Sequence, residues 1–215
     1  MMTPNAPFPI AATPITATPI TAKASDEQRA AASAPLDAQA TSRLVTALAP
    51  RVLAVTRAVL GRGHSDVDDA YQQAMLELIR ALPSFRGDCE PIYFASRIAA
   101  RTALAAARRS RTAFSRRDDD ADVDRIVVDV PAEDEMEQKR RMELLRDLLA
   151  RIPEEQAETL TLRVMLGWSL PDVAAATGAP LNTVRSRVRL AKNALRAAVE
   201  ADPILLEELD RRYAR

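Results

Sequence analysis

Charge is distributed unevenly along this chain, and its most acidic stretch divides it in two. Residues 118–139 contain ten acidic and two basic groups, begin with three consecutive aspartates, and have no sustained apolar period. Residues 41–117 contain 13 basic and six acidic groups, and residues 140–215 contain 13 basic and 11 acidic groups. This pattern predicts two basic modules joined by a flexible acidic linker. Basic modules of this kind favour a polyanion as the binding partner, although a solvated charged surface is also compatible with the pattern.

Composition favours helices in both modules. Only five of the 215 residues are glycine and 4% are aromatic, while alanine, leucine and arginine dominate, so we expect an all-α protein. The chain has no apolar run of about 18 residues and no basic and apolar signal segment at its start, so we expect a cytoplasmic protein without membrane insertion. Cys89 is the single cysteine. A single cysteine excludes an intrachain disulfide and a cysteine-based zinc cluster, and we expect no cofactor and no metal.

The expected domain boundaries follow these shifts in composition. The first 40 residues are rich in Ala, Pro and Ser and contain the near-repeat Ala-Thr-Pro-Ile-Thr twice in succession, so we predict a disordered extension. The remaining predicted segments are a first helical domain at 41–117, the acidic linker at 118–139, a second helical domain at 140–200 and a tail at 201–215.

Three amphipathic helices are predicted in the first domain. One begins at Ser42 and stops at Gly61, and a second begins after Ser65 or Asp66 and ends before Pro83. A loop follows, and the third helix spans about residues 92–109. The residues expected to face inward are Met75, Leu78, Ile79 and Leu82 in the second helix, and Phe94, Ile98 and Leu104 in the third. Arg97, Arg101 and Arg108 form a stripe that predicts an exposed cationic face on the third helix.

The second domain contains a pattern typical of a helix-turn-helix. Helical periodicity resumes near Met142 and breaks at Pro153. Ser169 and Asp172 have the spacing of a capping box at the start of a short helix, which Gly178 ends. The following helix begins at Leu181, and its apolar face is spaced to pack on the preceding helix.

The opposite face of that last helix has groups able to reach base edges and phosphates in a major groove. An ordinary helical hairpin with a solvated, arginine-rich face is the alternative interpretation of this segment. The candidate DNA-binding residues are Asn182, Thr183, Arg185, Ser186, Arg187, Arg189 and Lys192.

The first domain resembles region 2 of the extracytoplasmic function (ECF) group of sigma factors, in the sigma-70 family. The sequence from Asp66 to Gln73 is similar to the group's Asp-Ala-Glu-Asp-x-x-Gln-Glu signature, which implies docking on core RNA polymerase. The residues to which this role is carried over are Asp66, Asp68, Asp69, Gln72 and Gln73. The loop segment Phe85-Arg86-Gly87-Asp88 resembles the loop that receives an unstacked base of the minus 10 element. With Arg97, Arg101 and Arg108 it forms the implied minus 10 site, although Phe85 is equally compatible with a place in the core.

The second domain resembles region 4, which reads the minus 35 element, through a Leu-Pro pattern ending at Pro153 and through Thr183-Val184-Arg185-Ser186-Arg187. The chain departs from the family at four positions. Phe94 replaces the common Trp, Arg101 replaces Asn, Pro180 replaces Ser and Gln73 replaces Glu. Of these, Arg101 bears most on recognition of the minus 10 sequence because it places a cation where an amide is usual.

The resemblance implies a non-enzymatic initiation factor whose partners are core RNA polymerase and promoter DNA, with an anti-sigma factor as a further candidate partner. Two other classes of protein remain alternatives. A helix-turn-helix regulator acting without polymerase would account for the second domain only. A sigma-mimicking helical adaptor would account for the fold without DNA binding.

Overall fold

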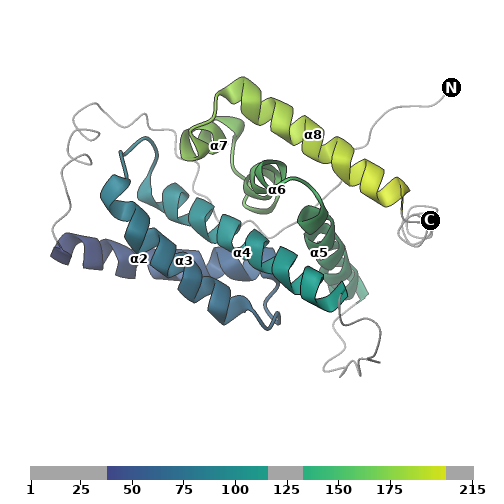
Figure 1. The fold of residues 1–215 in the computed structure, drawn as a ribbon, viewed down its shortest axis with the longest axis horizontal. Helices are drawn as coiled ribbons and strands as arrows, with labels where there is room; N and C mark the ends of the chain where they lie inside the picture. Colours follow the sequence, from purple (N-terminus) through teal and green to yellow (C-terminus); the bar gives the residue numbers. More distant parts are fainter. Residues whose placement is uncertain (1–37, 116–132, 202–215) are drawn as a thin grey trace.

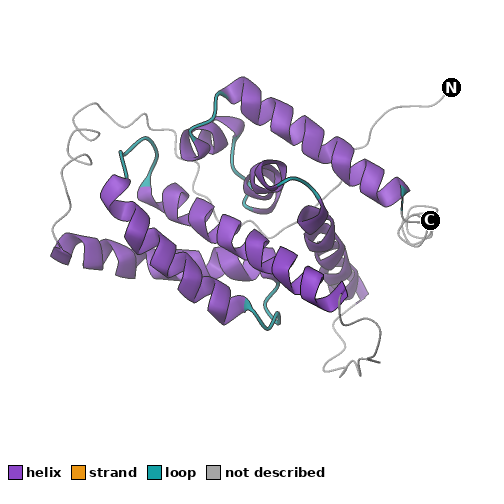
Figure 2. Ribbon diagram, viewed as in Figure 1, coloured by secondary structure: helices purple, strands orange, loops and turns teal. Residues whose placement is uncertain are grey.

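The computed structural model describes residues 38–115 and 133–201, and all regular elements within these two ranges are helical (Figure 1, Figure 2). The predicted all-α class is therefore confirmed for this part of the chain. Most of the predicted N-terminal extension and linker, and all but the first residue of the tail, lie outside the described residues. In chain order the elements are α2 (Ala38–Leu60), α3 (Val67–Ala81), a 3₁₀ turn η1 (Leu82–Ser84), α4 (Pro91–Ser115), α5 (Glu133–Arg151), α6 (Glu154–Leu160), a π-helical turn η2 (Thr161–Met165), α7 (Leu170–Thr177) and α8 (Leu181–Glu200).

Helices α2, α3 and α4 pack around one another and form the N-terminal unit (Figure 1). Apolar residues spaced three or four apart provide the buried face of each helix. Val52 and Val55 of α2 and Leu78 of α3 are at most 1% exposed. The predicted stop of the first helix is confirmed, because α2 ends at Leu60 and Gly61 follows with φ of 99°.

A row of alanines lets α4 lie close to α2 and α3. Ala95, Ala99, Ala100 and Ala103 are completely buried, and Leu104 beside them is 2% exposed. Small side chains shorten the distance at which two helices pack, so α4 is enclosed on this face without large residues. Of the three apolar residues predicted to be buried in this helix, Leu104 is fully buried, whereas Phe94 and Ile98 are partly buried and pack against the core.

The prediction that Ile79 faces inward is wrong. Its side chain is 45% exposed, whereas Leu78 next to it is fully buried. The buried face of α3 is set by Ala70, Ala74 and Leu78, which recur every four residues. Ile79 lies about 100° around the helix from Leu78, and its apolar character alone did not show which of the two neighbours pointed inward.

Helices α5 to α8 form the C-terminal unit. Helix α5 begins at Glu133, so residues 133–139, predicted as part of the linker, are helical. Pro153 then separates α5 from α6. Its fixed φ and its missing N–H make proline well suited to the start of a helix. The core of this unit is lined by Leu149, Leu162, Val173 and Val184, none of which is more than 1% exposed.

The two units are packed against each other. Helix α4 contacts α5, α6 and α7 along its length (Figure 1), and the buried residues of both units belong to one continuous hydrophobic cluster. The sequence predicted two modules with separate apolar faces. It did not predict that α4 packs on its own unit with one face and on the C-terminal unit with another.

Candidate nucleic-acid interface

The helix-turn-helix forms as its local sequence requires. The Oγ of Ser169 accepts a hydrogen bond from the backbone N–H of Asp172 at 3.2 Å, and the backbone N–H of Ser169 donates to the Asp172 carboxylate at 3.2 Å. This is the predicted capping box, and it fixes the start of α7. Gly178 ends the helix in the left-handed conformation, with φ of 67°, which a residue without a Cβ adopts at little cost. Pro180 then stands immediately before α8.

Helix α8 separates an apolar face from a polar one. Val184 and Ala191 are completely buried against the rest of the C-terminal unit. The predicted DNA-binding residues lie on the remaining surface, although not all to the same degree. Asn182, Arg185, Arg189 and Lys192 are exposed, and Thr183, Ser186 and Arg187 are half-buried.

Two arginines on α8 have different surroundings. Arg185 donates from Nη1 to the Oδ1 of Asn182, one turn earlier, at 3.1 Å, which keeps both side chains on the outer surface. Arg187 instead turns toward α6, where its Nη2 donates to the Oε2 of Glu155 at 2.5 Å. The structure therefore presents Arg185 directly to a ligand, whereas Arg187 is already engaged with a carboxylate.

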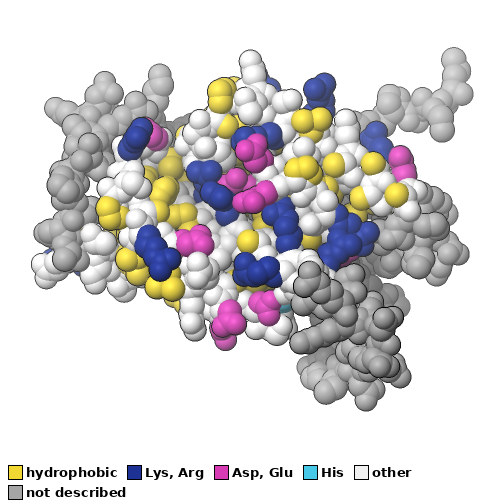
Figure 3. Space-filling view, viewed as in Figure 1, with side chains coloured by type: hydrophobic (Ala, Val, Ile, Leu, Met, Phe, Trp, Pro, Cys, Tyr) yellow, Lys and Arg dark blue, Asp and Glu magenta, His cyan; other side chains and the backbone are white. Residues whose placement is uncertain are grey.

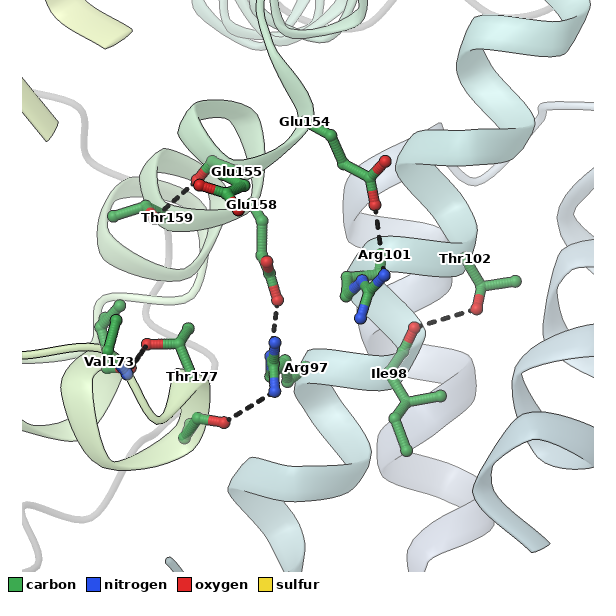
Figure 4. A network of polar contacts seen from close by, with 12 residues as sticks. Arg97, Ile98, Arg101, Thr102, Glu154, Glu155, Glu158, Thr159, Val173 and Thr177 are labelled. Carbon is green, nitrogen blue, oxygen red and sulfur yellow. Dashed lines mark hydrogen bonds and ion pairs between the residues drawn. The ribbon is translucent and has the colours of Figure 1, made fainter. Parts of the chain in front are cut away.

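The predicted cationic stripe of α4 is covered in part by the C-terminal unit, which differs from the exposed face that the spacing indicated (Figure 4). Arg97 donates from Nε to the Oε1 of Glu158 at 2.6 Å and from Nη1 to the backbone oxygen of Ala176 at 3.2 Å. Arg101 donates to the Oε1 of Glu154 at 3.4 Å. Periodicity correctly placed these arginines on one side of the helix, but it carries no information about partners that lie 53 to 79 residues away in the chain.

Arg108 completes this row. Its Nη2 donates to the backbone oxygen of Ile152 at 3.2 Å, and its Nη1 lies 4.0 Å from the Oε2 of Glu154. In the space-filling view, acidic side chains stand among the basic ones at the centre of this face, so the face lacks a continuous basic strip (Figure 3).

The loop before α4 holds the residues predicted to receive an unstacked base. Phe85 is half-buried, and its ring packs on that of Phe94 with centroids 4.8 Å apart and planes tilted by 45°. This packing favours the structural interpretation of Phe85. Arg86 and Asp88 are exposed, and Gly87 between them has φ of 73°.

Cys89, in the same loop, is half-buried. Burial, with a smaller contribution from the Asp88 carboxylate, raises the pKa of its thiol to about 11. The reactive form of cysteine is the thiolate, so this thiol is poorly suited to nucleophilic chemistry.

The residues predicted to dock on polymerase lie along α3. Asp68, Asp69, Gln72 and Gln73 are all exposed. Asp66 is placed differently, because its carboxylate accepts a hydrogen bond from the hydroxyl of Ser110 on α4. That hydrogen bond is the largest contribution lowering the pKa of Asp66. The position of Asp66 therefore ties the start of α3 to α4.

Two large apolar residues lie on the exposed side of α3, of which sequence reasoning missed Leu76 and placed Ile79 on the inner face. Leu76 is 48% exposed and Ile79 is 45% exposed, and both follow the exposed glutamines along the helix. Large apolar side chains in such a position are typical of protein contact surfaces. A signal was available in the sequence, because Leu76 falls outside the buried period of Ala70, Ala74 and Leu78.

Comparisons with known proteins agree with this arrangement. The family profile described as Sigma-70 region 2 matches residues 44–113, and the profile described as Sigma-70, region 4 matches residues 142–195. The ECF RNA polymerase sigma-E factor of Escherichia coli (strain K12) is 33% identical over 141 residues, which are 60% of this chain and 72% of that protein. The RNA polymerase sigma-H factor of Pseudomonas aeruginosa is 30% identical over 153 residues, which are 66% of this chain and 76% of that protein.

A solved structure of the sigma factor RpoE in complex with the anti-sigma factor NepR from Bartonella quintana is also similar, with 20% sequence identity and a TM-score of 0.43. That match covers 75% of this chain and 97% of the other.

A helical unit with a region 2 signature, followed by a helix-turn-helix with a region 4 signature, defines a transcription initiation factor. The chain belongs to the sigma-70 family and is a sigma factor of the ECF group. It directs RNA polymerase to promoters, and its partners are core RNA polymerase and promoter DNA. Sigma factors are initiation factors rather than enzymes. Within the described residues, no helix is both long enough and apolar enough to cross a membrane.

Proposed function

We propose that α8 reads the minus 35 element. The observation that carries this proposal is the polar face of α8, where Asn182, Arg185 and Arg189 are exposed while Val184 and Ala191 anchor the opposite side. Arginine presents paired donors, and asparagine presents a donor beside an acceptor, and both sets match base edges in the major groove. Lys192, two turns after Arg185 and also exposed, is suited to a flanking phosphate.

The N-terminal unit binds the minus 10 element through α4 and the loop that precedes it. Arg97, Arg101 and Arg108 supply guanidinium groups for phosphates, which makes this binding dependent on salt. An unstacked base would enter at the loop formed by residues 85–88, where Arg86 and Asp88 are exposed. Extruding a base costs a few kcal/mol, and the loop offsets this cost only while polymerase holds the DNA in place. The chain itself makes and breaks no bond.

The exposed side of α3 is the docking surface for core polymerase. Asp69, Gln72 and Gln73 supply its polar contacts, and Leu76 and Ile79 extend it with apolar area. Interfaces commonly have an apolar centre within a polar rim, and this surface has that composition. Asp68 lies in the first turn of α3, where a carboxylate is favoured by the helix dipole. Asp66 contributes indirectly, since it holds the start of α3 against α4.

The protein acts in the cytoplasm, where polymerase and DNA are available to it. An anti-sigma factor that covers the polymerase-binding surface would keep it inactive, as the family resemblance implies. Exposed apolar residues on α3 give such a partner a place to bind, and its binding would compete directly with polymerase.

The first test is run-off transcription with sigma-free core polymerase and genomic fragments, including the region upstream of the protein's own gene. Wild-type protein is compared with a variant in which Arg185, Arg187 and Arg189 are changed to Ala. We expect defined start sites with wild type and at least roughly tenfold fewer transcripts with the variant, because a good arginine–guanine pair contributes about 1–3 kcal/mol.

A matched variant changes Arg43, Arg57 and Arg62 to Ala. These three arginines are exposed on the N-terminal unit, so the variant has the same charge change but leaves α8 intact. Equal losses in the two variants would show that total charge, and not α8, determines initiation. If wild type gives no start on any fragment, the proposed division of promoter recognition fails.

A further inference from the structure

Helix α6 brings two carboxylates onto the arginines of α4. Glu158 accepts from Arg97 at 2.6 Å, and Glu154 accepts from Arg101 at 3.4 Å (Figure 4). Glu154 also lies within 4.0 Å of Arg108. Two acidic residues of the C-terminal unit thus face the three arginines expected to bind promoter phosphates.

The pair of Arg97 and Glu158 is the most enclosed of these contacts. The side chain of Glu158 is 7% exposed and that of Arg97 is 26% exposed. Removing two charges from water is costly unless their geometry is good and their remaining hydrogen-bonding groups find partners. Arg97 satisfies this condition by donating to the backbone oxygen of Ala176 as well. This contact is specific and differs from a chance approach of two surface side chains.

Contacts without a carboxylate hold the same interface. The ring of Tyr93 on α4 meets Trp168 edge to face, with centroids 4.6 Å apart and planes at 82°. At the other end, Arg146 of α5 donates from Nε and Nη2 to the backbone oxygen of Ala58 on α2, at 3.3 Å and 3.1 Å. Burial lowers the pKa of Arg146. The two units are therefore joined at both ends of the row of arginines.

A carboxylate and a phosphate compete for the same donors. Both present anionic oxygens that accept charge-assisted hydrogen bonds from a guanidinium group. An N–H group of Arg97 that donates to Glu158 is not available to DNA. Helices α6 and α7 also lie against α4 itself, so a DNA strand cannot approach Arg97 while they remain there.

We propose that Glu154 and Glu158 occupy the places of promoter phosphates on α4, so that the free protein is self-masked and must open before α4 binds DNA. This inference rests on the proposed minus 10 role of α4. Helix α6 remains attached to α8 during opening, because the two helices pack on each other inside the C-terminal unit, where Glu155 also pairs with Arg187. Binding to polymerase, which holds the two promoter elements apart, separates the units and exposes the α4 arginines.

The test measures the distance between the units in the free, full-length protein. Fluorescent donor and acceptor dyes are attached at Ala47→Cys on α2 and Ala197→Cys on α8, both exposed positions, after Cys89→Ser. The variant Glu154→Gln/Glu158→Gln keeps side-chain size but removes the charges. The control Glu90→Gln/Glu200→Gln also removes two carboxylates, both exposed, and keeps both pairs with α4 and the pair of Glu155 with Arg187.

We expect high energy transfer in wild type and in the control, and a clear loss of transfer in Glu154→Gln/Glu158→Gln. Raising the salt from about 0.05 M to about 0.5 M is expected to lower transfer in wild type, since shorter screening lengths weaken ion pairs. This salt titration decides the question if the variant does not fold. Transfer that stays high in the variant and at high salt, or that is already low in wild type, would overturn the proposal.

Run-off transcription separates this inference from the proposed function. With native Cys89 restored, Glu154→Gln/Glu158→Gln is expected to reach half-maximal initiation at a lower protein concentration than wild type. The expected ratio is up to roughly tenfold if about a tenth of wild type is open. If wild type initiates and the variant needs the same concentration, the masking proposal fails alone. If neither initiates, the proposed function fails, while energy transfer still reports whether the units are closed.

Discussion

Replacing Ser169 with alanine is expected to destabilise the helix-turn-helix through the loss of one cap. The Ser169 hydroxyl accepts from the N–H of Asp172 at 3.2 Å, and the backbone N–H of Ser169 donates back to the Asp172 carboxylate at 3.2 Å. Removing an N-cap serine costs about 1 kcal/mol, with a range of about 0.5–2 kcal/mol. For a chain of about this size that loss lowers Tm by roughly 2–4 °C.

The effect reaches DNA binding because α7 is too short to be stable without its surroundings. It has eight residues and is held by its caps and by burial of Val173 and Ala176. A loosened α7 no longer fixes the orientation of α8, so binding to the minus 35 element should weaken together with stability.

Urea unfolding followed by tryptophan fluorescence measures the cost directly. Trp168 is the single tryptophan of the chain and immediately precedes Ser169, so the signal reports on this part of the fold. Ser169→Thr retains a capping hydroxyl and serves as the control. We expect Ser169→Ala to lose about 1 kcal/mol and Ser169→Thr to lose about half of that or less. Equal losses in the two variants, or a loss below about 0.3 kcal/mol in Ser169→Ala, would refute the capping argument.

Three further predictions concern single residues. Gly178→Ala is expected to cost about 1 kcal/mol in urea unfolding because φ is +67° there, whereas Gly63→Ala, which has open space and no such φ, should change stability by only a few tenths of that. The carboxylate of Asp66, whose pKa is lowered chiefly by the Ser110 hydroxyl, contributes stability that is complete above its unfolded pKa and is lost as pH falls through its folded pKa. Asp66→Asn should therefore weaken the pH dependence of the urea midpoint between about pH 5 and pH 2 and lower the midpoint at neutral pH. An unchanged dependence on pH would contradict the assignment. Alkylation of Cys89 at pH 8, followed by mass spectrometry, should be at least tenfold slower than that of an unfolded control, since a pKa of about 11 leaves roughly 100-fold less thiolate than the ordinary value of 9.0; equal rates would show that the thiol is not buried.

Much of the fold was predictable from local sequence. Helix ends depend on residues close in the chain, so the capping box at Ser169 and the stop at Gly178 were correctly predicted, as was the start of α8 at Leu181. Amphipathic periodicity similarly gave the burial of Leu104, whereas the rest of the fully buried face of α4 is formed by alanines that it did not single out. The family assignment also followed from local motifs, because both signatures are short runs on single helices or adjacent loops.

One error concerned two neighbouring residues. Leu78 and Ile79 were both predicted to be buried, but only Leu78 is buried and Ile79 is exposed. The hydrogen bond between Asp66 and Ser110, 44 residues away, was not predicted, and the role of Asp66 in polymerase binding stays a prediction. In both cases the packing of α3 against α4 decided the outcome.

The sequence by itself determined the helices, their caps, the basic surface of α8 and membership in the sigma-70 family. These features depend on interactions within one helix turn or on short motifs, which the order of residues specifies directly. The tertiary structure alone decided that Trp168 meets Tyr93, that Arg187 turns to Glu155, and that the arginines of α4 face the carboxylates of α6. The reason is physical: side-chain pairing across two units depends on how separate helices pack, and the spacing of charges along one helix contains no record of the partner that will neutralise them.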